Sequence, residues 1–196
     1  MPTVIESIRP DQLALYASVP MICHVDSVLV VAGMHTGADG FYLHEIPVSV
    51  PYDKDYDACP DGGPLDWPKQ FDLANWAFWL ARQGDQLVGA AAVAWNTSAL
   101  QMLENRSDLA VLWDIRVRDS SRRQGVATAL FATAARWAQA HACHALRIET
   151  QNVNVPACRF YARMGCSLAR IDRHAYAHIP QLAHETMLLW HRPLPI

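Results

Sequence analysis

The chain has 196 residues, of which 52% are hydrophobic and 18% are charged, and its formal net charge is −3. This composition supports one sizeable core and excludes a disordered chain. The small negative charge gives no general attraction to nucleic acid or to an anionic membrane. There is no signal-peptide pattern and no apolar run of about 18 residues, so we expect a cytoplasmic protein without membrane spans.

The first third of the chain is read from local patterns. Residues 10–18 favour a short helix, and residues 25–31 and 41–50 favour strands joined by a turn at 36–40. Residues 51–68 contain four prolines and a Gly-Gly pair, which predicts a long loop. Long ordered loops are often functional, so we expect this one to contribute to a site.

From residue 75 the hydrophobic pattern becomes regular. Two strands, NWAFWLARQ and LVGAAAVAW, flank a tight turn at Gly84-Asp85. The remaining expected elements are the strand LAVLWDIRV, the helix VATALFATAARWAQAHA, the strand CHALRIET, the short helix NVPACRFYARMG and the strands CSLARIDRHAY and ETMLLWHRP.

The segment 109–127 places a strand, a basic glycine-containing turn and a helix N-terminus in succession. The first backbone N–H groups of a helix have no intrahelical partner, and the helix dipole favours an anion there. Gly125 and Ala127 allow a bulky anion to come close, and Arg122 and Arg123 add positive charge. The pattern predicts a pyrophosphate cradle, with an ordinary strand-to-helix turn as the alternative. The dinucleotide-binding and Walker glycine patterns are missing.

A second motif follows the next strand, and the two motifs together carry a family resemblance. The first is Val117, then RDSS, then Arg122-Arg123-Gln124-Gly125-Val126-Ala127; the second is Asn154, Ala157, Phe160-Tyr161 and Gly165-Cys166. In this order the chain resembles the GNAT superfamily of N-acetyltransferases over residues 85–191. The strings WDIRV, IETQNVNVPACRFYARMGC, MLLWHRPL and IPVSVPYDKDY make it most similar to the streptothricin acetyltransferases.

The resemblance implies an α/β GNAT fold with a central, mixed but mostly antiparallel twisted sheet of about six to seven strands flanked by helices. It implies a single domain, 1–196, in which residues 75–196 form the acetyl-CoA-binding core. Residues 1–74 would form a variable acceptor-side part with an extra strand and loop region. Acetyl-CoA would be the acyl-donor cosubstrate, without a metal.

The resemblance also implies roles for individual residues. The backbone of Ile115, Arg116 and Val117 would hold the pantetheine arm as an added strand would. The N–H groups of the turn and helix start would hold the diphosphate, and these residues are Arg122, Arg123, Gln124, Gly125, Val126, Ala127 and Thr128. Asn154 would hydrogen-bond the cofactor arm, and Tyr161 would protonate the departing thiolate. Thioester aminolysis needs this proton and a stabilised carbonyl oxygen.

A primary amine acceptor must be bound as an ammonium and then deprotonated. Asp114, within an apolar strand, and Glu149, at the end of the next strand, are candidate catalytic and substrate-binding carboxylates. For Asp114 the alternative is a salt bridge with Arg116 or Arg147. For Glu149 it is a helix-capping or loop-anchoring carboxylate.

Further acceptor-side candidates are Tyr52, Asp53, Tyr56 and Trp76. The first three would belong to an acidic lid over a cationic ligand, or to a solvated surface loop. Trp76 would line the pocket, or, like most of the tryptophans, would pack in the core. Cys158 and Cys166 have no Cys–His pattern for nucleophilic catalysis, and His174 and His178 lack a metal-binding context.

We therefore expect transfer of an acetyl group to a primary amine of a small cationic molecule, with a streptothricin-type antibiotic as the favoured acceptor, by direct attack in a ternary complex. One alternative is an acetyltransferase for polyamines or for peptide or protein N-termini. Another is a regulatory module that binds CoA without catalysis. No nucleic-acid or membrane partner is expected, and a homodimer is open because dimers are common in the superfamily.

Overall fold

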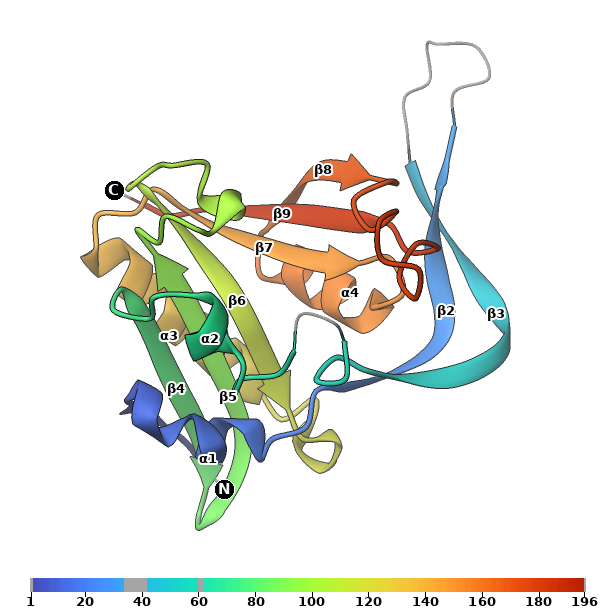
Figure 1. Ribbon diagram of the computed structural model, residues 1–196. Coiled ribbons are helices and arrows are strands. Elements are labelled where there is room, and N and C mark those ends of the chain that lie inside the picture. The colour runs from blue at the N-terminus through green and yellow to red at the C-terminus, as the bar shows by residue number, and fades with distance from the viewer. Residues whose placement is uncertain (1, 34–41, 60–61, 196) are drawn as a thin grey trace. The chain divides into compact units, whose positions relative to one another are not determined.

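The computed structural model describes residues 2–33, 42–59 and 62–195, so the predicted turn at 36–40 lies outside it. Each predicted helix and strand has a counterpart (Figure 1). The strands are β1 (Thr3–Ile8), β2 (Ile22–Ala32), β3 (Tyr42–Asp55), β4 (Trp76–Gln83), β5 (Gln86–Trp95), β6 (Leu109–Val117), β7 (Ala145–Gln151), β8 (Ser167–Asp172) and β9 (Met187–Pro193). The helices are η1 (Pro10–Gln12), α1 (Leu13–Ala17), α2 (Trp67–Gln70), η2 (Gln101–Leu103), η3 (Asp119–Ser121), α3 (Val126–Ala140) and α4 (Val155–Arg163).

The strands confirm the expected α/β class. Seven of them form one mostly antiparallel sheet in the order β1-β4-β5-β6-β7-β9-β8, in which β6 and β7 are parallel. Strands β2 and β3 form a separate two-stranded sheet. The chain makes two compact units, one of Met1–Ile22, Asp55–Ile148 and His191–Ile196, the other of Cys23–Lys54 and Glu149–Trp190. The single domain divided after residue 74 stays a prediction.

Several local features differ from the expectation: α2 begins at Trp67, inside the predicted loop, and β8 ends at Asp172, four residues before the predicted strand does. Strand β1 was not predicted, because a short N-terminal segment with alternating polar residues carries a weak pattern; it pairs antiparallel with β4, from Thr3–Gln83 to Ile8–Phe78. The loop predicted for 51–68 is wrong at its start, since β3 continues to Asp55. Both strands of a two-stranded sheet are edge strands, where a proline such as Pro51 is tolerated.

The core of the first unit lies on both faces of β5. Ala90, Ala92 and Ala94 belong to a buried cluster rich in aromatic side chains from α1, α2 and β4. Gly89 faces the other way, where an added Cβ would lie 2.9 Å from a Val126 methyl of α3. Small side chains along β5 therefore let α1 and α2 cover one face of the strands and α3 the other (Figure 1).

A β-bulge interrupts β6 at Trp113. Ala92 pairs with Asp114 and the next residue of β5, Val93, pairs with Leu112, so Trp113 is the extra residue. A bulge resets the alternation of side chains along a strand. It places Asp114 and Arg116 on the face that α1 covers.

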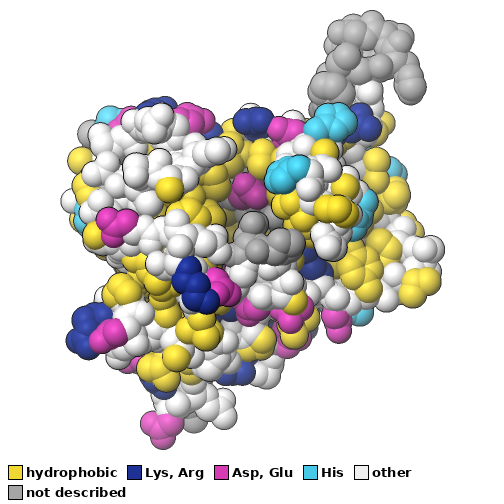
Figure 2. Space-filling model, in the orientation of Figure 1, with side chains coloured by type: hydrophobic (Ala, Val, Ile, Leu, Met, Phe, Trp, Pro, Cys, Tyr) yellow, Lys and Arg dark blue, Asp and Glu magenta, His cyan; other side chains and the backbone are white. Residues whose placement is uncertain are grey.

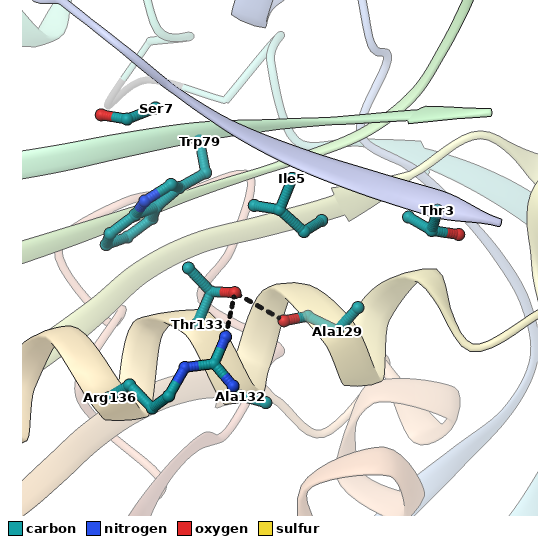
Figure 3. A pocket seen from close by; sticks show the side chains of 8 residues that line it. All are labelled: Thr3, Ile5, Ser7, Trp79, Ala129, Ala132, Thr133 and Arg136. Atoms are coloured by element: carbon teal, nitrogen blue, oxygen red, sulfur yellow. Dashed lines mark hydrogen bonds between the residues drawn. The ribbon is translucent and has the colours of Figure 1, made fainter. Parts of the chain in front are cut away.

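Helix α3 leaves a shallow cavity of about 510 Å³ against β1 and β4. Ile5 and Trp79 face Ala129 and Thr133 of the helix across it, and Arg136 donates to the Thr133 hydroxyl at 3.1 Å (Figure 3). The residues lining it include no carboxylate and no tyrosine, so the chemistry sought for an amine acceptor is not found there.

Asn152, a buried residue directly after β7, connects three segments of the second unit through hydrogen bonds. Its side chain donates to the Leu29 carbonyl of β2 at 2.9 Å and accepts from the Thr186 N–H at 2.8 Å. Its backbone carbonyl accepts from the Leu29 N–H, and its N–H donates to the Thr186 carbonyl, each at 2.9 Å. One polar residue therefore fixes both β2 and the start of β9 to the end of β7.

Charged side chains of both signs are interspersed on the face drawn in Figure 2. Among the described residues, no helix is long and apolar enough to cross a bilayer.

Candidate active site

The turn before α3 has the backbone of an anion-binding site. Gly125 caps the helix in the left-handed region, at φ 83°, and Arg123 is also left-handed, at φ 61°. The consequence is a sharp turn that exposes residues 122–125 and directs the chain into a helix of 15 residues. The first N–H groups of such a helix, which begin at Val126, need acceptors from outside the helix.

The predicted side-chain contributions from this turn are partly used elsewhere. Arg122 donates to the Ile22 carbonyl at 2.6 Å and pairs with Asp119 at 2.7 Å. Gln124 donates to the Ser120 carbonyl at 2.9 Å. These bonds stabilise the conformation of the turn. Because the Arg122 and Gln124 side chains are used in this way, the backbone N–H groups are the predicted ligand-binding groups.

The space around Gly125 fits a bulky anion. A Cβ added at Gly125 would have no described atom within 4 Å apart from its chain neighbours, whereas one at Gly89 would collide with both helix and strand. The glycine is therefore required by its φ angle and not by packing within the protein. This is the arrangement expected of a diphosphate cradle.

We expect Gly125→Ala to raise the KM for acetyl-CoA about tenfold or more, because the methyl group keeps the diphosphate from the N–H groups that bind it. Gly84→Ala is the matched control, since Gly84 is also left-handed, at φ 58°, but lies in the β4–β5 turn. Both changes should cost about 1–2 kcal/mol of stability. Steady-state kinetics and urea unfolding measure both quantities, and an equal rise in KM for the two variants would contradict the cradle.

Strand β6 leaves part of its backbone without a strand partner on one side. It pairs with β5 along its length, but the register with β7 covers only Leu109–Val111 against Ala145–Arg147. Within the described residues the pairing with β7 ends at Val111, although β6 continues to Val117. The predicted pantetheine-binding residues Ile115, Arg116 and Val117 lie in this last part of β6, where an extended ligand can take the place of a strand.

Asp114 lies in a buried hydrogen-bond network, and its side chain is only 6% exposed. Arg116 donates to both of its oxygens, at 2.9 and 2.7 Å, and the Tyr16 hydroxyl donates to Oδ1 at 2.5 Å. Arg116 also donates to Asp57 and to the Val19 carbonyl, each at 2.9 Å. The salt bridge that was the alternative for Asp114 is therefore present, with Arg116 and not with Arg147.

This network raises the pKa values of two of its members, Arg116 and Tyr16. Burial alone would lower the pKa of Arg116, but attraction to Asp114 outweighs it and the pKa is raised. Burial and the adjacent Asp114 charge raise the pKa of Tyr16 well above its usual value, so the phenol stays a donor. A direct role for Asp114 in binding an ammonium would require exchange of one of these partners, and that role stays a prediction.

Asn154 begins α4. Its Oδ1 accepts from the Ala157 N–H at 3.2 Å and lies 3.5 Å from the Cys23 sulfur. Capping the helix fixes the orientation of the side chain and leaves the amide NH₂ as the donor it can offer to a ligand. The predicted bond to the cofactor arm needs such a donor.

Tyr161 lies on the same helix and is 5% exposed. Its ring centroid is 5.4 Å from that of Phe160 and 6.4 Å from that of Trp190, so aromatic packing holds the phenol in place. Cys158, also on α4, is unsuited to nucleophilic attack, because burial raises the pKa of its thiol to about 11.

Glu149 is half-buried near the end of β7. One carboxylate oxygen accepts from the hydroxyl of Tyr176 at 2.7 Å, and that hydroxyl accepts from the Gln151 amide at 2.9 Å. Tyr176 comes from the β8–β9 connection, which the sequence analysis assigned no function. No local motif marks it, because the contact joins residues far apart in sequence.

The residues of the predicted acidic lid belong to both compact units, and the lid stays a prediction. Tyr52 and Asp53 are neighbours on β3, where consecutive side chains point to opposite faces. Asp53 pairs with His24 at 2.7 Å with both side chains exposed. Tyr52 faces the other way, and burial, followed by the Glu185 charge, raises its pKa. Tyr56 follows β3 in the first unit, where its N–H donates to the Met21 carbonyl at 3.0 Å.

Trp76 is 7% exposed and sits in the aromatic cluster, with its ring centroid 5.4 Å from Phe71 and 5.5 Å from Trp113. Its indole N–H donates to the Thr97 hydroxyl at 3.1 Å. This is the core alternative for Trp76, and a substrate contact stays a prediction. Within the described residues, no group of three or more His, Cys, Asp or Glu side chains could hold a metal ion.

Comparison with known proteins shows similarity to acetyltransferases. Residues 48–166 match the acetyltransferase (GNAT) family, from β3 to the end of α4. A streptothricin acetyltransferase of Escherichia coli is 33% identical over 161 residues, which are 82% of this chain and 81% of that protein. The family match spans β6, the turn before α3 and the helix with Asn154 and Tyr161.

Two solved structures share the fold. Nourseothricin acetyltransferase has a TM-score of 0.76 at 24% identity, with full coverage of both chains. A protein of Bacillus anthracis described as a streptothricin acetyltransferase, in complex with acetyl coenzyme A, also has a TM-score of 0.76, at 21% identity, covering 98% of this chain and all of that one.

A glycine-capped helix start beside a strand with a free backbone edge defines, with these matches, an acetyltransferase that uses acetyl-CoA. The chain belongs to the acetyltransferase (GNAT) family.

Proposed function

We propose that the chain transfers the acetyl group of acetyl-CoA to a primary amine of a small cationic molecule, and that a streptothricin-type antibiotic is its acceptor. The structural observation that carries this is the end of the recorded β6–β7 pairing at Val111, within the described residues, together with the exposed turn 122–125 before α3. The choice of acceptor is supported by the Escherichia coli relative, whose similarity extends over most of both chains.

In this proposal the backbone N–H groups from Arg122 to Thr128 bind the diphosphate, and the free edge of Ile115–Val117 binds the pantetheine arm. A backbone N–H near Val117 stabilises the carbonyl oxygen as the amine attacks. Asn154 orients the arm through its amide NH₂. These contacts position the thioester carbon for attack, which is the larger part of what the protein must supply.

Three proton transfers complete the proposed reaction. Glu149, directly or through a water molecule, takes the proton that the ammonium must lose before its nitrogen attacks the thioester carbon. The new C–N bond forms as the C–S bond breaks, Tyr161 gives its proton to the departing thiolate, and the nitrogen returns its second proton to the Tyr161 oxygen to leave the neutral amide. Asp114 supports the site by neutralising Arg116, which in turn holds Asp57 and the Val19 carbonyl.

The test incubates the protein with acetyl-CoA and one acceptor at a time. CoA release is measured by the reaction of its free thiol with a chromogenic reagent. The acceptors are streptothricin, spermidine, a lysine-free peptide with a free N-terminus, and buffer alone. We expect turnover with streptothricin and a product heavier by one acetyl group in mass spectrometry. Turnover with the peptide or with spermidine, but not with streptothricin, would show that the proposed acceptor is wrong. Thermal stabilisation by CoA with no turnover on any amine would indicate a binding module.

A further inference from the structure

The β8–β9 connection, drawn in red in Figure 1, brings a tyrosine to the carboxylate of Glu149. This connection is a series of turns, with backbone bonds from Ala177 to His174, from Ile179 to Tyr176 and from Leu182 to Ile179. Tyr176 is half-buried within it. Its position is therefore set by the turns on one side and by β7 on the other.

The hydrogen bonds of Tyr176 have a defined direction. An amide NH₂ can only donate, so the Gln151 side chain donates to the phenol oxygen. The phenol proton is thereby directed to Glu149 Oε1, at 2.7 Å. Gln151 and Glu149 are two residues apart on β7 and share a face of the strand. The hydrogen bonds from Gln151 to Tyr176 and from Tyr176 to Glu149 thus direct the phenol proton to one oxygen of the Glu149 carboxylate.

The charges around Tyr176 also favour the hydrogen bond from its hydroxyl to Glu149. Burial, then the Glu149 charge, raise the pKa of Tyr176, so the phenol keeps its proton. Glu185 is the second carboxylate that acts on Tyr176, and it is neutralised by the buried Lys54, whose ammonium lies 2.6 Å from Glu185 Oε1. The Glu185–Lys54 pair leaves Glu149 as the carboxylate on which the Tyr176 proton acts.

We propose that Tyr176 is the positioning residue for Glu149, holding its carboxylate in the one orientation in which it receives the ammonium of the acceptor. This rests on the proposed role of Glu149 in the transfer reaction. Tyr176 acts through Glu149 and has no bond to make or break in the reaction itself. The acceptor class it favours is a primary ammonium, because an ionised carboxylate binds a cation and accepts its proton.

The first test is the pH profile of kcat/KM for streptothricin. A hydrogen bond donated to a carboxylate favours the ionised form, so its removal makes that form harder to reach. In Tyr176→Phe we expect the acidic limb to move about one unit to higher pH and the neutral-pH kcat/KM to fall about tenfold, with the KM for acetyl-CoA unchanged. Tyr42→Phe is the matched control, because Tyr42 is 59% exposed and distant in sequence from Glu149. A limb that stays in place would overturn the proposal.

The second test needs no acceptor and separates this inference from the proposed function. In a double-mutant cycle with Tyr176→Phe, Glu149→Gln and the combined variant, urea unfolding of the free protein measures the coupling of the two side chains. We expect the Tyr176→Phe change to lose most of its effect in the Glu149→Gln background. If wild type has no streptothricin activity but coupling is found, the proposed acceptor fails while the contact stands; additive effects would overturn the positioning role whatever the activity.

Discussion

Tyr161→Phe is expected to lower kcat about 100-fold or more while the KM for acetyl-CoA changes less than about threefold. The ring is buried between Phe160 and Trp190, and phenylalanine keeps that packing. What the variant lacks is the hydroxyl that would protonate the thiolate as the C–S bond breaks. Because the loss concerns the transition state and not the bound cosubstrate, it should fall on kcat.

The measurement is steady-state kinetics with acetyl-CoA and the acceptor, accompanied by rapid-mixing experiments that show whether chemistry limits turnover. Cys158→Ala is a control on the same helix, and it should keep most of the activity, because a buried thiol with a pKa of about 11 is not a nucleophile. Equal kcat for Tyr161→Phe and wild type, with chemistry rate-limiting, would remove Tyr161 as the acid.

Asp114→Asn is expected to lower the free energy of unfolding by about 3–5 kcal/mol, because it leaves the buried Arg116 without its main counter-charge. The Arg116 side chain is 2% exposed, so water cannot replace the lost carboxylate. Asp57 remains, but it makes one bond to Arg116 where Asp114 makes two. An asparagine oxygen can still accept from Tyr16, so the loss reports the charge and not the packing.

Urea unfolding measures this loss, with Asp108→Asn as the matched control. Asp108 also pairs with an arginine, but its side chain is 36% exposed and that of Arg106 is 47% exposed, so we expect a loss below about 1 kcal/mol. The two roles considered for Asp114 are to neutralise Arg116 and to bind the acceptor ammonium, and the same measurements separate them. If Asp114→Asn kept wild-type stability and lost kcat/KM for cationic acceptors alone, Asp114 would contact the acceptor directly.

The local features of the site followed from neighbouring residues. The strand before Val117, the turn with Gly125 and the helix after it are confirmed, because hydrophobic spacing and a glycine with its required φ lie within a few residues of one another. The same holds for Asn154, whose capping bond is to Ala157 three residues later. Such interactions are formed by one segment, so one segment of sequence is enough to predict them.

The side-chain partners required the tertiary structure. The carboxylate of Asp114 could have bound a ligand or an arginine, and the choice was made by Tyr16 and Arg116, together with a bulge at Trp113 that turns both Asp114 and Arg116 to one face. Tyr176 reaches Glu149 only because a turn-rich connection returns along β7.

By itself, the sequence determined the class of fold, the order of its elements and the two motifs of the family, since each depends on backbone preference and hydrophobic period within a segment. Only the tertiary structure decided where the β6–β7 pairing ends, which carboxylate is paired with Arg116 and which accepts from Tyr176. Strand register and long-range hydrogen bonds depend on the packing of the whole chain, and no short segment contains that information.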